Sequence, residues 1–243
     1  MRLKYIVPLF VLAFLASPVK AEEGEFVLPV VTYPALVEAG ASPESFVPQG
    51  WVVEHKMVGD LDADGISDAV LVLRDKDPAN LVTDAQYGDA LFDTNPRMLV
   101  VVFGQADGGY RLALENHRLI PRPDNSSQDD VLSESGGVSI ERGSLKVTLY
   151  LFMSAGGWDM GNTSYTFRHE KGKFRLIGYD TYNVHRGSGD IGEVSINLLN
   201  GKVILKTGHI SQDDSKVTAR KLKKKPYLTI EDVGDGSGLQ FDY

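Results

Sequence analysis

From residue 51 onward, short apolar or alternating runs are separated by turns rich in glycine. Between residues 145 and 151, Lys146, Thr148 and Tyr150 alternate with apolar residues, which predicts a strand with one solvated face. The uninterrupted apolar run at 69–73 predicts a strand that is buried on both faces. Further strands are predicted over 51–57, 98–103, 110–114, 137–141, 164–169, 174–179, 194–199 and 203–206, with weaker candidates at 227–230 and 239–241.

Glycine-bearing turns join these strands in pairs, at 105–109, 142–143, 170–173 and 200–201. Asn200 and Gly201 form the pair best suited to a type I′ turn, because both residue types tolerate positive φ. Successive hairpins without a convincing long helix predict a mostly β fold, in which antiparallel hairpins form a sandwich or a propeller-like assembly with few short helices. We expect residues 51–243 to form a single β domain.

The N-terminal part of the chain divides into two segments. A basic start, an apolar run over residues 5–15 and small residues before Ala21 follow the order of a secretory signal peptide, which we assign to residues 1–21. Crossing a membrane takes roughly 18–20 apolar residues, and this run is shorter. Residues 22–50 are rich in proline and are expected to pack on the β domain, with a helix start at Ser42 and Pro43.

The negative net charge and the absence of cysteine exclude several classes of function and of membrane attachment. The chain has 25 basic and 33 acidic residues, a net charge of −8, and removal of Arg2, Lys4 and Lys20 with the signal peptide gives −11. A negative field disfavours nucleic acid and anionic lipid and favours cations. Without cysteine, the chain has neither disulfides nor the lipidated cysteine of a bacterial lipoprotein. We expect a periplasmic or secreted protein with no membrane span in the mature chain.

The strongest chemical signal is an acidic loop over residues 59–68, with the pattern D-x-D-x-D-G-x-x-D. Calcium is a hard cation that takes six to eight oxygen ligands. Alternate carboxylates in this pattern can turn toward one centre, and Gly65 permits the sharp reversal. Four acids this close repel one another unless a cation lies among them. The predicted calcium ligands are Asp60, Asp62, Asp64, the carbonyl of Ile66, and Asp68.

The loop differs from an EF-hand and resembles another family. An EF-hand needs a Glu at position twelve, which is Leu71 here, and helices on both sides, whereas residues 69–73 predict a strand. Residues 59–71 resemble the calcium loop of the FG-GAP or VCBS repeat, found in integrin α-chain propellers and many bacterial surface proteins. That resemblance covers about residues 56–73 and implies a loop between two strands whose acids ligate calcium. Propellers carry several copies and this chain has one, so only the loop is carried over.

Other residues give weaker signals. The histidines lack zinc-binding spacing, and Ser154 lacks the G-x-S-x-G context of a nucleophile. Trp158 either displays its ring for stacking on a sugar or is buried under a Gly-rich turn, and burial is the favoured interpretation. The basic run Arg220–Lys225 either docks an anionic partner or forms a Lys-rich edge strand, where charge discourages edge-to-edge pairing; the edge strand is favoured.

Two functions stay open at this point. The first is a non-catalytic binding or interaction module of the cell envelope, with calcium in a structural role and an envelope protein or a cell-wall polymer as partner. The alternative is an envelope hydrolase that acts on a glycan or peptide, with calcium shaping the active-site loop, although the sequence names no catalytic residue. Titratable side chains that converge in a deep pocket would favour the hydrolase, and a flat or convex surface would favour the module.

Overall fold

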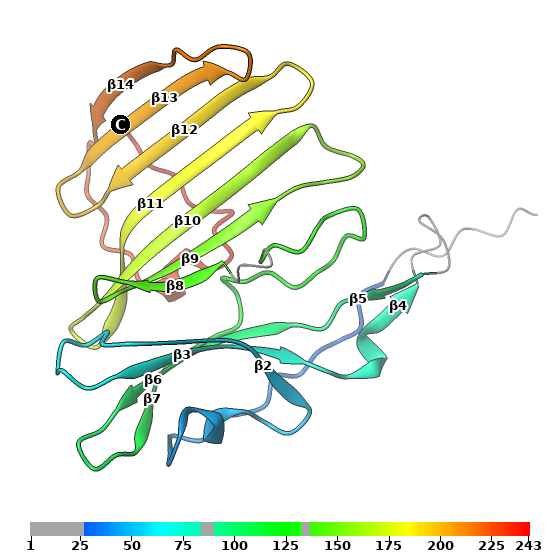
Figure 1. Cartoon of the computed structure of the whole chain (residues 1–243), viewed down its shortest axis with the longest axis vertical. Helices are drawn as coiled ribbons and strands as arrows, with labels where there is room; N and C mark the ends of the chain where they lie inside the picture. The colour runs from blue at the N-terminus through cyan, green and yellow to red at the C-terminus, as the bar shows by residue number, and fades with distance from the viewer. Residues whose placement is uncertain (1–26, 84–89, 133–136) are drawn as a thin grey trace, which may run out of the picture.

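Two antiparallel sheets, formed mainly by different halves of the chain, face each other in the computed structural model (Figure 1). The structure describes residues 27–83, 90–132 and 137–243, so the signal peptide predicted over residues 1–21 lies outside the described residues. The smaller sheet has the order β1-β7-β6-β3-β2, and the larger one is a meander with the order β14-β13-β12-β11-β10-β9-β8. The mostly β prediction is confirmed, in a sandwich-like arrangement.

The five-stranded sheet comprises β1 (Ala39–Gly40), β2 (Trp51–Gly59), β3 (Asp68–Asp75), β6 (Arg97–Gly104) and β7 (Tyr110–Asn116). The seven-stranded sheet comprises β8 (Val138–Glu141), β9 (Ser144–Leu151), β10 (Asp159–Glu170), β11 (Lys173–His185), β12 (Asp190–Asn197), β13 (Lys202–His209) and β14 (Lys216–Lys221). A two-stranded ribbon is formed by β4 (Leu81–Thr83) and β5 (Leu91–Asp93). The helical elements are the 3₁₀ turns η1 (Pro43–Phe46) and η2 (Pro78–Asn80) and the helix α1 (Ile230–Val233).

The central strands β3 and β6 are buried on both faces, which explains their unbroken apolar sequences. Their inner side chains, such as Val72 and Leu99, join a core with side chains from the seven-stranded sheet, such as Val147 and Phe167. Their outer side chains form a second core with residues that include Leu71, Met98, Phe46 and Trp51. Each fully buried side chain of this kind contributes about 1.5–3 kcal/mol relative to exposure.

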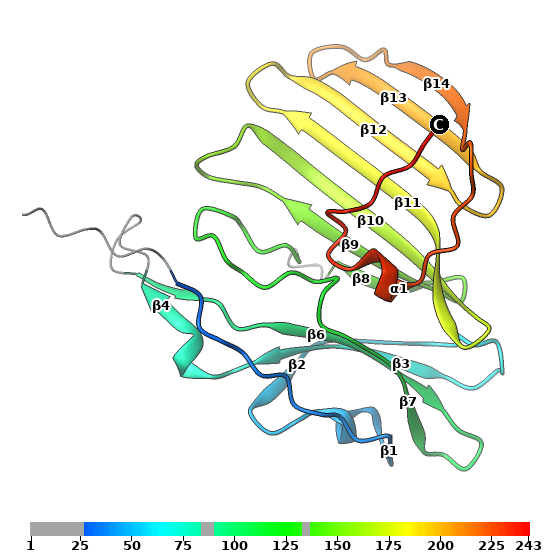
Figure 2. The same ribbon diagram turned by 180° about the vertical axis from the view of Figure 1, so that it is seen from behind.

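Residues 27–50 run along the outer face of the five-stranded sheet and close the second core (Figure 2). The ring of Tyr33 stacks on that of His117, with centroids 4.0 Å apart. The predicted helix start at Ser42 is confirmed as the first turn of η1, where Ser42 and Ser45 form a capping box. Among the described residues, no helix has the length and apolar character that crossing a membrane requires.

The C-terminal segment packs across the face of the seven-stranded sheet that is turned toward the viewer in Figure 2. The strands predicted at 227–230 and 239–241 were wrong. Thr229 makes one isolated bridge and then begins α1, because the Asp232 carboxylate accepts its backbone N–H at 2.8 Å and its hydroxyl at 2.9 Å. A capping pair therefore outweighs the β-like composition of this segment.

The type I′ turns occur at positions other than the one predicted. Asn200 and Gly201 belong to a four-residue loop in which the Asn197 side chain accepts two backbone N–H groups, and Asn200 is not in the left-handed region. Both central residues have positive φ at 142–143 and at 171–172, where Arg142 and Lys171 adopt values of 53° and 54°. These two turns are the ones that match the strand twist.

The basic run lies at an edge of the larger sheet. Arg220 and Lys221 belong to β14, which is an edge strand of the sheet and is mostly exposed. The prediction of an edge strand is therefore confirmed for Arg220 and Lys221, whereas Lys223, Lys224 and Lys225 follow the end of β14.

Candidate functional site

The acidic loop, residues 59–68, runs from the last residue of β2 to the first residue of β3. Ala63 and Gly65 both have positive φ, at 66° and 86°, so the chain reverses sharply there. The Asp60 carboxylate accepts the backbone N–H of Ala63 at 2.7 Å and that of Gly65 at 3.0 Å. The loop therefore curls around the Asp60 side chain, and its exit into β3 confirms that it is not the helix-flanked loop of an EF-hand.

Asp68 joins the loop to the middle of the five-stranded sheet. Its side chain is fully buried and accepts the backbone N–H of Leu61 at 2.7 Å and that of Gly104, at the end of β6, at 3.0 Å. Burial raises the pKa of Asp68; the two amide hydrogen bonds oppose this shift and the charges of Asp62 and Asp60 add to it, with a net rise. The ionised form of this carboxylate therefore lies in surroundings that disfavour its charge.

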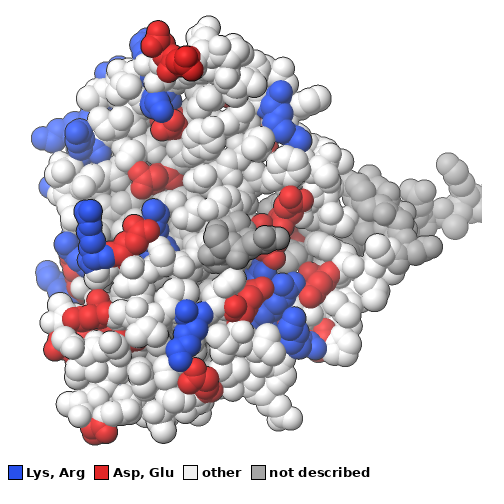
Figure 3. Space-filling model, viewed as in Figure 1, with Lys and Arg blue, Asp and Glu red and all other residues white. Residues whose placement is uncertain are grey.

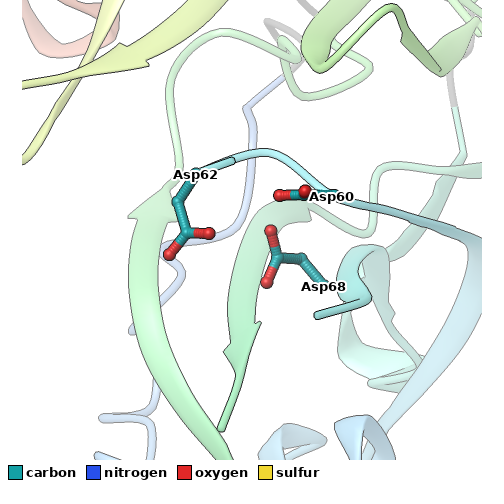
Figure 4. Close-up of side chains that lie close together, drawn as sticks. All are labelled: Asp60, Asp62 and Asp68. Carbon is teal, nitrogen blue, oxygen red and sulfur yellow. The ribbon is translucent and has the colours of Figure 1, made fainter. Parts of the chain in front are cut away.

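The structure brings three of the predicted ligands together. Oxygens of Asp60, Asp62 and Asp68 lie within 4.8 Å of one another and point toward one shared space (Figure 4). Two oxygens on opposite sides of a calcium ion would be about 5 Å apart, because each lies 2.3–2.6 Å from the ion. The spacing therefore fits one calcium ion. Asp64 is outside this group and accepts the Ile66 backbone N–H at 2.7 Å, and the Ile66 carbonyl stays a predicted ligand.

A second site, which the sequence did not indicate, is a cleft of about 630 Å³ between the two sheets. Its lining comes from β2, β6, β9 and the segments that flank β8 and β9. Figure 3 shows acidic and basic side chains side by side in the region where the sheets meet. The lining residues are Glu54, His55, Arg97, Asp129, Asp130, Leu132, Tyr150 and Phe152.

The centre of this cleft is a buried guanidinium held by two carboxylates. The Arg97 side chain is 1% exposed, and its Nε and Nη2 donate to Glu54 at 2.5 and 2.8 Å. Its Nη1 and Nη2 also donate to Asp130, at 3.0 and 2.6 Å. Arg74, the cross-strand neighbour of Arg97, donates to Glu54 at 3.1 Å and pairs with Asp93 at 3.0 Å. These bidentate pairs are strong and fix the side-chain geometry.

A β-bulge in β2 places Glu54 in this cluster. Val53 pairs with Leu73 and His55 with Val72, so Glu54 is an extra residue without a partner on β3. Such a bulge bends the strand and re-aims side chains. As a result, Glu54 and His55, although adjacent in sequence, both line the cleft.

The ion pairs set the protonation of the cleft. Burial alone would raise the pKa of Glu54, but the hydrogen bonds and charges of Arg97 and Arg74 outweigh it, and the net pKa is below its usual value. Burial alone would lower the pKa of Arg97, but its bonds to Glu54 and Asp130 raise it further above an already high value. Glu54 and Arg97 are therefore both charged near neutral pH.

Aromatic rings lie on the β9 side of the cleft. Tyr150 and Phe152 line it, and Arg186 packs over the Phe152 ring with its guanidinium carbon 4.7 Å from the centroid. Trp158 follows in the same connection between β9 and β10 and is 65% exposed. The prediction that Trp158 is buried was wrong.

The sequence predicts the five proposed ligands of the loop but not the residues of the cleft. The acidic loop is local, so its residue spacing is visible in the chain. Glu54 and Asp130 are 43 and 33 residues away from Arg97, so no short pattern joins them. The available signal was an arginine at the end of each of two apolar strands, Arg74 after residues 69–73 and Arg97 before 98–103.

Comparisons with protein-family models, with curated proteins and with solved structures found no match to this chain. The resemblance of residues 59–71 to the FG-GAP or VCBS loop therefore stays a prediction.

Proposed function

We propose that this chain is an exported calcium-binding β protein that acts as a non-catalytic binding module of the cell envelope. The observation that carries the proposal is the convergence of the Asp60, Asp62 and Asp68 carboxylates within 4.8 Å at a sharp strand connection. Without a cation, three ionised groups at this spacing repel one another. Calcium, as a hard cation with oxygen ligands, suits this donor set.

The proposed role of calcium is structural. An ion among these carboxylates would join the end of β2 to the start of β3, and through the Asp68 contact with Gly104 it would also stabilise the end of β6. Asp64 and the Ile66 carbonyl are proposed to complete the coordination. Extracellular calcium modules bind with dissociation constants of about 10⁻⁴–10⁻³ M, so ordinary extracellular calcium would fill the site.

The proposed location is the periplasm or the exterior of the cell. It rests on the signal-peptide pattern over residues 1–21, which would make Glu22 the first residue of the mature chain. The partner in this proposal is an envelope protein or a cell-wall polymer. The negative net charge argues against nucleic acid as that partner.

The second candidate function, an envelope hydrolase, is favoured by the titratable side chains that converge on the cleft. Glycoside hydrolysis, for example, needs one carboxylic acid that stays protonated and a second carboxylate across the scissile bond. Glu54 has a lowered pKa, and it shares the Arg97 guanidinium with Asp130. A carboxylate pair that is neutralised by the protein's own arginine suits binding better than acid catalysis.

The proposal is tested by the calcium dependence of thermal unfolding. A ligand that binds only the folded state stabilises it by RT ln(1 + [L]/Kd), which at 10 mM calcium gives about 1.4–2.7 kcal/mol for the affinities above. For a domain of this size, that free energy raises Tm by roughly 3–10 °C over the chelated protein. The Asp62→Ala, Asp64→Ala double variant should lose most of this rise.

The matched control is Asp213→Ala with Asp214→Ala, which removes two exposed acids from the β13–β14 loop. This control should keep the full calcium response, because its charge change is the same but it leaves the loop intact. No calcium uptake by the purified protein in calorimetry at millimolar calcium would overturn the proposal. An equal response in both double variants would place the ion elsewhere.

A further inference from the structure

The cleft between the sheets offers negative charge that the protein does not neutralise itself. Among its lining residues, Glu54, Asp129 and Asp130 are acidic and Arg97 is basic. Arg74 also pairs with Glu54 at 3.1 Å and lies 3.9 Å from Asp130, so the two arginines balance these two acids and the charge of Asp129 is left over. The Arg97 nitrogens donate to Glu54 and Asp130, so this guanidinium is engaged within the protein. The unpaired charge of Asp129 therefore repels an anionic ligand and attracts a cationic one.

Asp129 differs from the other two acids of the cleft because no arginine pairs with it. It is exposed, and none of the ion pairs among the described residues includes its carboxylate. Its backbone is fixed, because its N–H donates to the carbonyl of Phe152 at 3.0 Å. The carboxylate is thus held beside the aromatic side of the cleft with its charge available.

The cleft also has an apolar surface beside its acids, formed by Leu132, Tyr150 and Phe152. Lysine and arginine side chains combine a long apolar stem with a charged end, so they bind best where apolar surface leads to carboxylates. The guanidinium of Arg186 packs over one face of Phe152 and donates to the carbonyls of Met153 and Gly157, so this contact belongs to the protein itself.

We propose that the cleft receives a lysine or arginine side chain from an extended basic segment of a partner protein. The stem would lie along Tyr150 and Phe152, and the charged end would reach Asp129. The volume of about 630 Å³ exceeds one side chain and leaves room for the backbone and the neighbouring residues of the segment. This inference rests on the binding-module part of the proposed function and supplies the chemistry of its partner.

The test uses the mature chain and three fluorescent peptides of equal length, in which alanine alternates with arginine, glutamine or glutamate. Fluorescence anisotropy in calcium should show binding of the arginine peptide at least tenfold tighter than that of the glutamine peptide, and no binding of the glutamate peptide. Asp129→Asn should weaken binding of the arginine peptide roughly tenfold, because a charge-assisted contact is lost. Asp213→Asn is the matched control, since it makes the same charge change in an exposed loop, and it should leave affinity unchanged.

Equal binding of the arginine and glutamine peptides would overturn the inference. So would an equal loss from Asp129→Asn and Asp213→Asn, because the attraction would then come from net charge alone. A neutral oligosaccharide that binds the cleft and is lost in Tyr150→Ser, with no basic peptide bound, would assign the cleft to a sugar and overturn the inference as well. If Asp129→Asn does not fold, Phe152→Leu replaces it, with the same expected weakening because the apolar wall is lost.

The calcium response is measured on the same samples, which separates the two proposals. Loss of peptide binding with an intact calcium rise in Tm would overturn the cleft inference alone. Peptide binding without any calcium response would overturn the proposed calcium site alone.

Discussion

The acidic loop and the cleft both gather carboxylates, but they balance the charge in different ways. In the cleft, Glu54 and Asp130 are paired with a buried arginine that comes from the centre of the sheet. In the loop, backbone N–H groups donate to Asp60, Asp62 and Asp68. None of the ion pairs among the described residues includes these three carboxylates. The Glu54 and Asp130 carboxylates thus have their cation within the protein, whereas the loop carboxylates are proposed to depend on an external ion. Chelation should therefore affect the loop and leave the cleft cluster intact.

The largest expected effect comes from removing the cation of the cleft. Arg97→Met should lower the free energy of unfolding by about 3–5 kcal/mol, because Glu54 and Asp130 then keep only the longer contacts to Arg74, at 3.1 and 3.9 Å. Urea denaturation with and without calcium measures this loss. The loss should be the same in calcium and in chelator, since the pair does not involve the ion. A loss below about 1 kcal/mol would show that Arg97 does not hold the cleft acids together.

A smaller effect is expected when one carboxylate is neutralised. The lowered pKa of Glu54 means that its contribution is fully present above the unfolded Glu pKa of about 4.3 and is lost as pH falls through the folded value. At pH 7, Glu54→Gln should be less stable than the parent by about 1.5–3 kcal/mol, as for hydrogen bonds to charged groups. The two proteins should converge in stability once the pH has fallen below the folded pKa of Glu54. Urea curves across this pH range in chelator provide the measurement, and a difference that does not change with pH would contradict the lowered pKa.

The smallest effect is expected at an exposed ion pair, which sets the baseline for the comparison. Lys206 and Glu193 face each other on β13 and β12 at 2.7 Å, and both side chains are over a third exposed. Lys206→Met should change the free energy of unfolding by only about 0.2–1 kcal/mol, because solvent screens the pair. The same urea assay measures it. A change as large as that of Arg97→Met would mean that burial is not what distinguishes the cleft.

The sequence predicts what is encoded by neighbouring residues. The hairpins, the strands β3 and β6 and the acidic loop each depend on short-range patterns, and the structure contains them. Strands β10 and β11 extend well beyond their predicted bounds, since their outer halves are polar and gain their partners from neighbouring strands. The cleft could not be predicted because Arg97 meets Glu54 and Asp130 only after two sheets have packed. The prediction that Trp158 is buried was wrong for a related reason, because the exposure of a loop side chain depends on what packs above the loop.

The bulge in β2 makes the number of residues in that strand as important as their identity. Trp51 and Val53, before the bulge, belong to the outer core, whereas Met57, after it, packs against the core between the sheets. A strand with regular alternation would place all three on one face. Deletion of a single residue between 53 and 57 would therefore exchange inner and outer positions along one end of the strand. Over evolutionary time, the length of this segment should vary less than its composition.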